Sequence, residues 1–357
     1  MRIGIDVRPL SRSRSGIARY TEGLLKSLLQ QTDADWFFYS DSLVFDKSKY
    51  PSVTFRDEEL PKLFSPFRTQ VTFSRWAIKD RLDVFWSPRH HLPLFLPSSI
   101  RQLVTVHDLV WQRFPETMNF STLMMERMLM PKSIANADYV LVDCLAIKNE
   151  LELRFPKAEQ KIRVISPGIS EFPEPKSVRL AVADYFLCVG TFEPRKNIQG
   201  MLDAFYEYRK RGGVHELIVV GLKGWGDRPL VDSRYRHVVT ILGSVSDEDL
   251  GGYYRDATAL LCLSYYEGFG LPVLEAMSFG TPTIGSKGGA IEEVIGDSGF
   301  VVGSDEIDEA ATCLQQFDSQ PDLGAKLGLI AIKRSEDFSW NDSASQLADL
   351  FGAQQYQ

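Results

Sequence analysis

Two acidic residues flank a glycine-containing turn in the second half of the chain. Glu267 and Glu275 are separated by seven residues, which include Gly268, Gly270 and Pro272. Proline favours the start of a helix, and glycine lets the backbone approach a ligand closely. A glycine loop that leads into a helix offers free N–H groups and the positive end of the helix dipole to an anion. The stretch therefore predicts a phosphate site between two carboxylates.

The positions of the two acids predict different contacts. Glu275 lies about one turn inside the expected helix, and helical side chains lean back toward the N-terminus. Both acids would then face one cleft, on either side of a bound phosphate, and such a carboxylate is well placed to accept ribose hydroxyls. The alternative is a buried Rossmann-type turn whose glutamates face solvent.

Two basic residues follow another predicted strand, Tyr185–Val189. The chain continues with Gly190 and reaches Arg195, Lys196 and Asn197. Arginine offers a planar fork of donors and lysine a point charge, the two usual ways to hold a diphosphate. Asn197 is expected to cap the next helix, which places both cations at a strand end, where open α/β sheets bind ligands.

The first half of the chain contributes further candidates. His107 follows the predicted strand 103–106, and an imidazole can donate to a sugar hydroxyl or carbonyl near neutral pH. Gly16 begins a predicted helix, where its backbone could approach phosphate or sugar, and Arg12 and Arg14 precede it in a polar loop. The alternatives are a structural histidine and a solvated loop.

Predicted strands alternate with helical patterns along almost the whole chain, which indicates a parallel α/β architecture. The first strand, 3–7, precedes a helix expected over 16–31. A short stretch rich in proline and glycine, Ser166–Ile169 followed by 171–175, is the best domain boundary. The 357 residues suffice for two domains.

Composition limits the function further. The net charge of −7 argues against nucleic acid as the main partner, and the 44% hydrophobic content is typical of a soluble protein. No apolar run approaches the roughly 20 residues of a membrane span, and the N-terminus lacks a signal-peptide core, so we expect the cytoplasm. The four cysteines form no CxxC pair and are expected to be reduced, with no disulfide or zinc site.

The phrase EGFGLPVLEAMSFGTPTI, which begins at Glu267, resembles the Glu-x7-Glu signature of a large class of glycosyltransferases. These are retaining, nucleotide-sugar-dependent enzymes of family four with the GT-B fold, and they include bacterial enzymes of lipopolysaccharide and exopolysaccharide assembly. The resemblance implies two Rossmann-like domains facing across a cleft. Residues 1–170 would bind the acceptor and 171–335 the nucleotide sugar, while a helix within 336–357 would cross back to the first domain.

The resemblance also implies roles for individual residues. His107, in a VHDL segment like that of the family, would lie beside the donor sugar, and Glu267 would position a hydroxyl of that sugar. Arg195 and Lys196 would hold the diphosphate, although Thr191 stands where many members have an arginine. The full donor-binding set is Gly16, Gly190, Arg195, Lys196, Leu242, Gly243, Gly268, Phe269, Gly270, Leu271 and Glu275.

The implied reaction transfers a hexose from UDP-glucose or GDP-mannose to a glycan or lipid-linked sugar, with retention of anomeric configuration. No cofactor and no metal are expected, because protein cations and backbone amides would stabilise the diphosphate leaving group. A sugar-nucleotide epimerase or a phosphorylase-like enzyme on the same fold is the alternative. A dehydrogenase is disfavoured because no GxGxxG follows the first strand, and a non-catalytic sugar-binding protein because both acids and both cations are present.

Residues 62–81 contain five basic residues interleaved with aromatic and aliphatic ones. Basic amphipathic helices of this kind lie on anionic membrane surfaces. They also pack on sheets through their apolar face. The sequence leaves open both a peripheral contact with the inner face of the plasma membrane and simple packing on the first domain.

Overall fold

The computed structural model describes residues 1–11, 15–42, 46–57, 65–175, 184–222, 224 and 229–352, with backbone only for Ser65–Phe67 and Pro321. The chain divides into two compact units. The first comprises Met1–Arg113, Asn119–Gly168 and the segment that begins at Ser339, and the second comprises Phe114–Met118 and Ile169–Phe338. Phe114–Met118 thus groups with the second unit, although it lies within the range 1–170 expected for the first.

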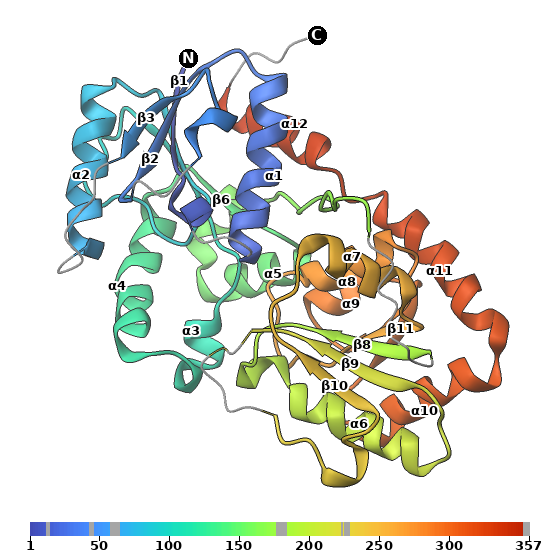
Figure 1. Cartoon of the computed structure of the whole chain (residues 1–357). Coiled ribbons are helices and arrows are strands. Elements are labelled where there is room, and N and C mark those ends of the chain that lie inside the picture. Colours follow the sequence, from blue (N-terminus) through green and yellow to red (C-terminus); the bar gives the residue numbers. More distant parts are fainter. Residues whose placement is uncertain are drawn as a thin grey trace. The chain divides into compact units, whose positions relative to one another are not determined.

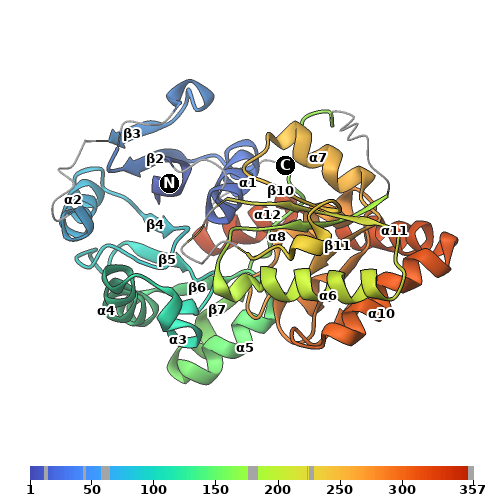
Figure 2. The same cartoon turned by 60° about the horizontal axis from the view of Figure 1, so that its bottom comes forward.

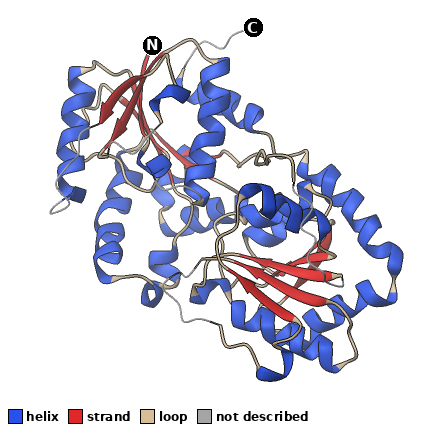
Figure 3. Cartoon of the chain, viewed as in Figure 1, coloured by secondary structure: helices blue, strands red, loops and turns tan. Residues whose placement is uncertain are grey.

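A parallel sheet forms the centre of the first unit, with strand order β3-β2-β1-β4-β5-β6-β7. Its strands are β1 (Arg2–Asp6), β2 (Asp35–Ser40), β3 (Thr54–Asp57), β4 (Val84–Ser87), β5 (Arg101–Thr105), β6 (Tyr139–Val142) and β7 (Ile162–Val164). The helices around it are α1 (Gly16–Gln31), α2 (Ser65–Lys79), α3 (Val110–Arg113), α4 (Phe120–Asn136), α5 (Leu145–Arg154) and α12 (Trp340–Phe351). Figure 3 shows the strands in red and the helices in blue.

The second unit repeats this plan with strand order β10-β9-β8-β11-β12-β13, again parallel. Its strands are β8 (Tyr185–Val189), β9 (Glu216–Val220), β10 (Val239–Leu242), β11 (Ala259–Cys262), β12 (Thr283–Ser286) and β13 (Gly299–Val302). Its helices are α6 (Ile198–Lys210), α7 (Asp247–Asp256), α8 (Leu271–Ser278), α9 (Ala290–Ile295), α10 (Ile307–Ser319) and α11 (Pro321–Ser335). Helix α10 packs on α6, and α11 packs on α8.

The last helix completes the core of the first unit. Helix α12 packs on α1, and Figures 1 and 2 show the two side by side. Phe351 is 1% exposed, and its ring centroid lies 6.4 Å from that of Trp36 and 6.2 Å from that of Trp86. A Cβ on Gly23 of α1 would lie 2.4 Å from the ring of Trp340, so the close approach of the two helices requires glycine there.

Most expectations about the elements are confirmed. Both sheets are parallel, α1 covers the predicted range 16–31, and Asn197 caps α6 with its side-chain oxygen. The four cysteines are buried and free. The predicted strands 3–7, 103–106 and 185–189 correspond to β1, β5 and β8.

Helix α2 lies within the basic segment 62–81, of which residues 62–64 lie outside the described part. Phe73 and Ala77 on α2 are fully buried, whereas Val71 is 43% and Ile78 56% exposed. Phe73 also packs against Tyr39 of β2. The helix therefore packs on the sheet through one apolar face and leaves two aliphatic side chains on the other. No described helix is both long and apolar enough to cross a membrane.

We expect Phe351→Ala to destabilise the first unit by about 3–5 kcal/mol, because it removes a buried ring between two tryptophans. Urea unfolding followed by tryptophan fluorescence measures this, since five of the six tryptophans belong to the first unit. Leu329→Ala, which truncates a side chain 72% exposed on α11, is the control. A loss below about 1 kcal/mol for Phe351→Ala would show that α12 is not part of this core.

Candidate active site

A short turn after β8 holds two cations at the carboxyl end of the second sheet. Pro194–Lys196 form one turn of 3-10 helix, and Asn197 follows in the left-handed conformation with φ of 52°. Its side-chain amide donates to the carbonyls of Leu263 at 3.0 Å and Ser304 at 2.9 Å. A non-glycine residue in this conformation costs free energy, and these hydrogen bonds fix the turn beside the end of β11.

Glu267 is bound to both cations. Its carboxylate accepts hydrogen bonds from Lys196 Nζ, from Arg195 Nη1 at 3.2 Å and from Ser264 Oγ at 2.9 Å. The side chain of Glu267 is 7% exposed, and those of Arg195 and Lys196 are 18% and 13% exposed. We call Glu193, Arg195, Lys196 and Glu267 the cation–carboxylate cluster.

Glu193 is the second carboxylate of the cluster, and Thr191 binds it. Arg195 Nε donates to Glu193 Oε2 at 2.9 Å, and Thr191 Oγ1 donates to Glu193 Oε1 at 2.8 Å. Thr191 therefore orients the carboxylate that holds Arg195. The cluster balances two cations with two carboxylates, so each cation already has an anionic partner. Neither Glu193 nor Ser264 was predicted from the sequence, although Glu193 lies two residues before Arg195.

The electrostatics of the cluster keep Glu267 charged. Burial acts to raise the pKa of Glu267, but the charges of Lys196 and Arg195 and the hydrogen bonds to the carboxylate outweigh it and hold the pKa below its ordinary value. Cys262 beside it shows the opposite effect, since burial and the charge of Glu267 raise the pKa of its thiol to about 11.

The glycine loop after Glu267 leads directly into α8. Gly270 caps the helix with φ of 97°, and a Cβ there would lie 2.5 Å from Ile291 Cδ1, so both backbone conformation and space require glycine. Leu271 is the first helical residue, and Phe269 is buried against Phe338. Helix α8 therefore begins shortly after Glu267, so its N-terminus adjoins the cation–carboxylate cluster in the sequence.

Glu275 lies in a different environment from Glu267. It is 4% exposed, and its two carboxylate oxygens accept hydrogen bonds from Tyr254 at 2.9 Å and Ser170 at 3.1 Å. Neither partner was predicted from the sequence, because Tyr254 lies on α7 and Ser170 lies near the start of the second unit. The solvent-facing alternative for these two glutamates is wrong, because both side chains are buried.

Three other residues predicted to bind the donor, Gly190, Leu242 and Gly243, lie at the carboxyl ends of strands in the second sheet. Gly190 follows β8, and a Cβ on it would lie 3.8 Å from Cδ of Lys196. Leu242 ends β10, and Gly243 after it is exposed, with no atom within 4 Å of the place a Cβ would occupy.

His107 and Gly16 belong to the first unit. The His107 side chain is buried, with Nδ1 2.7 Å from Asp143 Oδ2 and Nε2 3.1 Å from the carbonyl oxygen of Pro88. Burial raises the pKa of Asp143 despite the charge of His107. Gly16 is exposed at the start of α1, after the capping residue Ser15. Arg12 and Arg14 lie outside the described residues.

The histidines near His107 form their own polar group. Glu126 Oε2 lies 3.3 Å from His90 Nδ1 and 3.0 Å from His91 Nε2. Burial acts to lower the pKa of His90, but Glu126 raises it above its ordinary value. Among the described residues, no group of three or more histidine, cysteine, aspartate or glutamate side chains is arranged to hold a metal ion.

Residues 175–334 match the family model described as Glycosyl transferases group 1. This part of the chain is a group 1 glycosyltransferase domain. The domain contains the whole cation–carboxylate cluster, the glycine loop and Glu275, so the residues predicted for the donor site lie within the matched region, apart from Gly16.

Relatives extend the similarity beyond this group 1 glycosyltransferase domain. The chain is 29% identical over 390 residues to O-antigen chain mannosyltransferase B of Escherichia coli. This alignment covers 98% of this chain and 99% of that protein. The chain is 26% identical over 337 residues to O-antigen chain mannosyltransferase RfbU of Salmonella typhimurium, covering 89% and 91%.

Solved structures show the same fold. Sucrose-phosphate synthase from Thermosynechococcus elongatus superposes with a TM-score of 0.76 at 20% identity, covering 98% of each chain. With the two Rossmann-like parallel sheets, this likeness confirms the predicted GT-B fold class.

The depressed pKa of Glu267 predicts a pH effect on stability. Its contribution is complete above the unfolded-state pKa, about 4.5, and is lost as pH falls through the lower folded-state pKa, because the unfolded chain then binds more protons. Relative to Glu267→Gln, the wild type should therefore lose stability as pH falls below about 4.5. Thermal unfolding of both proteins between neutral and acid pH measures the difference in Tm. A difference that stays constant through this range would contradict the charge pairing.

Proposed function

We propose that the chain is a retaining hexosyltransferase that uses a nucleoside diphosphate sugar as its donor. The observation that supports this most directly is the cation–carboxylate cluster, which adjoins the glycine loop and the N-terminus of α8 within the group 1 glycosyltransferase domain. Fixed cations and oriented N–H groups stabilise the negative charge that develops on a leaving diphosphate.

Binding of the donor exchanges partners within the cluster. Arg195 and Lys196 are held by Glu193 and Glu267 in the described structure. A diphosphate competes for these cations, and the carboxylate of Glu267 then turns to a hydroxyl of the donor sugar. Glu193 keeps its bond to Thr191, so Arg195 is oriented even when Glu267 has moved.

The proposed reaction follows a front-face route. The bond between the anomeric carbon and the diphosphate oxygen breaks, and the acceptor oxygen bonds to the same face of that carbon. The proton of the acceptor hydroxyl passes to a phosphate oxygen, so the route needs no protein nucleophile. We assign no metal ion to this mechanism. His107 would contact the donor sugar, and Glu275 would accept ribose hydroxyls after release from Tyr254 and Ser170.

Mannose is the sugar we favour, because the two relatives reported above are named mannosyltransferases. GDP-mannose is then the first donor to test and UDP-glucose the second. By the same comparison, we propose that the acceptor is a glycan or lipid-linked saccharide and that the product enters a cell-surface polysaccharide. The compartment proposed is the cytoplasm.

Glu267→Ala should lower kcat by about 100-fold or more, since it removes a group that acts on the reacting sugar. Nucleoside diphosphate affinity should not fall, because both cations lose a competing partner. Transfer from GDP-mannose and from UDP-glucose, with the anomeric product read by NMR, and calorimetry with GDP and UDP measure the two effects. Glu336→Ala, at an exposed glutamate, is the control. Wild-type turnover in Glu267→Ala would remove Glu267 from the mechanism.

Helix α2 is the candidate for peripheral membrane contact. Arg68, Val71, Arg75, Ile78 and Lys79 are all exposed along it. We expect the protein to co-sediment with vesicles containing phosphatidylglycerol, and Arg75→Glu to weaken this by lowering the positive charge near the surface. Equal sedimentation of the variant and the wild type, or none of either, would contradict a membrane role for α2.

A further inference from the structure

A cavity of about 330 Å³ lies next to the cation–carboxylate cluster in the second unit. Its lining residues come from three separate parts of the chain: Phe114, Glu116, Thr117, Pro194 and Tyr265. The first three belong to the segment between α3 and α4 that groups with the second unit. The volume is at the lower end of the range, about 300–1,000 Å³, that is typical of small-molecule sites.

The cavity shares its wall with the proposed donor site. Pro194 precedes Arg195 directly, and the N–H of Tyr265 donates to the carbonyl of Arg195 at 2.8 Å. Arg195 Nη1 in turn donates to the carbonyl of Tyr266 at 3.2 Å. The backbone around Arg195 and the backbone of Tyr265 and Tyr266 therefore have two roles. They form the wall of the cavity, and they hold Arg195, the cation proposed to bind the diphosphate.

Two aromatic rings give the cavity an apolar surface of fixed orientation. Tyr265 is 44% exposed, and its hydroxyl donates to Asp305 Oδ1 at 2.7 Å, which holds the ring in place. Phe114 packs on Tyr266, with ring centroids 6.0 Å apart. Large aromatic side chains left accessible at a concave surface supply binding energy at low entropic cost.

Polar groups lie beside these rings. Glu116 is exposed and offers carboxylate oxygens, and the hydroxyl of Thr117 donates to the carbonyl of Phe114 at 2.8 Å and so retains acceptor capacity. A pyranose ring is complementary to this surface. Its faces of C–H groups can stack on the aromatic rings, and the hydroxyls at its edge can donate to the carboxylate of Glu116. A phosphate would not match this surface, because it carries the same charge as Glu116 and has no hydrogen-bond donor to offer the carboxylate.

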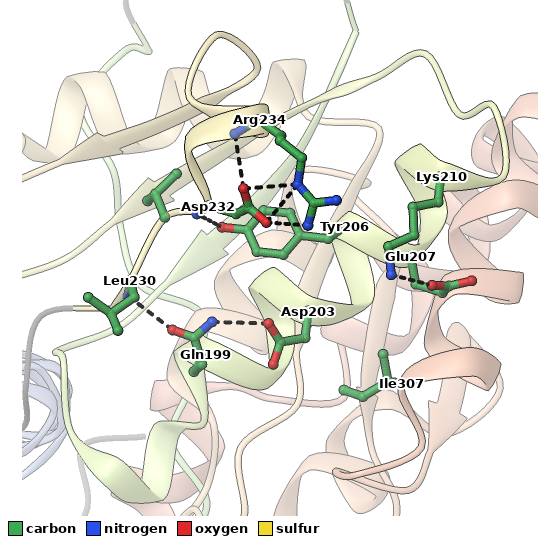
Figure 4. A pocket seen from close by; sticks show the side chains of 10 residues that line it. Gln199, Asp203, Tyr206, Glu207, Lys210, Leu230, Asp232, Arg234 and Ile307 are labelled. Atoms are coloured by element: carbon green, nitrogen blue, oxygen red, sulfur yellow. Dashed lines mark hydrogen bonds and ion pairs between the residues drawn. The ribbon is translucent and has the colours of Figure 1, made fainter.

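A second hollow in this unit, about 510 Å³, does not offer the same chemistry. Figure 4 shows that its polar side chains pair with one another: Arg234 with Asp232, Lys210 with Glu207, and Gln199 with Asp203. It contains no residue of the proposed donor site. This hollow therefore serves as the internal comparison.

We propose that the cavity lined by Phe114, Glu116 and Tyr265 binds one pyranose ring of the saccharide acceptor. The inference rests on the proposed glycosyl transfer and adds to it, because it assigns an acceptor contact to the unit that holds the donor. Stacking on Tyr265 and Phe114 sets the position of the ring, and Glu116 accepts hydroxyls at its edge.

Saturation-transfer NMR tests the cavity with methyl α-1,3-mannobioside and methyl α-maltoside as probes, in the presence of GDP or UDP. Wild-type protein should transfer saturation to at least one probe. Tyr265→Ala and Phe114→Ala should each weaken binding by about 10-fold, the effect of losing one aromatic stacking partner. Tyr265→Phe, which keeps the ring but loses the hydrogen bond to Asp305, should bind more tightly than Tyr265→Ala, and Leu230→Ala, in the other hollow, should bind like the wild type.

The outcomes separate this inference from the proposed function. GDP or UDP affinity, measured by calorimetry, should be unchanged in all four variants, and this also verifies that they fold. Nucleotide binding without saturation transfer to either probe, or equal transfer in Tyr265→Ala and Leu230→Ala, would overturn the acceptor cavity and leave the donor site intact. Absence of nucleotide binding in the wild type would instead contradict the proposed function.

Discussion

The pairing of Glu267 with Lys196 and Arg195 is the interaction on which the rest of the candidate site depends. These groups come from the ends of two neighbouring strands, β8 and β11, and meet only because the sheet is parallel. Asn197 accepts a left-handed conformation to hold the cationic turn there. Ser264 and Glu193 then fix the carboxylate and the guanidinium, so the charges are oriented before any ligand arrives.

The balance of charge in this cluster explains how two largely buried cations can share one carboxylate at the edge of the sheet. Two buried cations alone would repel each other and lose hydration, at a cost of several kcal/mol. The two carboxylates offset this cost, and one of them, Glu267, is also the group that our proposal assigns to the donor sugar. In our proposal, phosphate replaces Glu267 at the two cations, so that arrival of the donor releases the carboxylate.

The sequence predicted the elements better than it predicted the contacts. Parallel sheets, the helix over 16–31 and the cap at Asn197 depend on local patterns, and they are confirmed. The contacts of Thr191 and Glu275 depend on side-chain rotamers and on elements far apart in sequence. Spacing along the chain could not show that Thr191 orients Glu193, or that Tyr254 binds Glu275. Nor could it show that Phe114–Met118 groups with the second unit.

The most direct test of the account is calorimetric titration with GDP and UDP in the presence of EDTA, for the wild type and for Lys196→Ala. If protein cations hold the diphosphate, the wild type binds one of the nucleotides equally well with and without EDTA. Lys196→Ala should then bind it about 10-fold more weakly or worse, as expected for the loss of a charge-assisted contact. Binding that disappears on chelation, or that is unaffected by Lys196→Ala, would contradict the central claim.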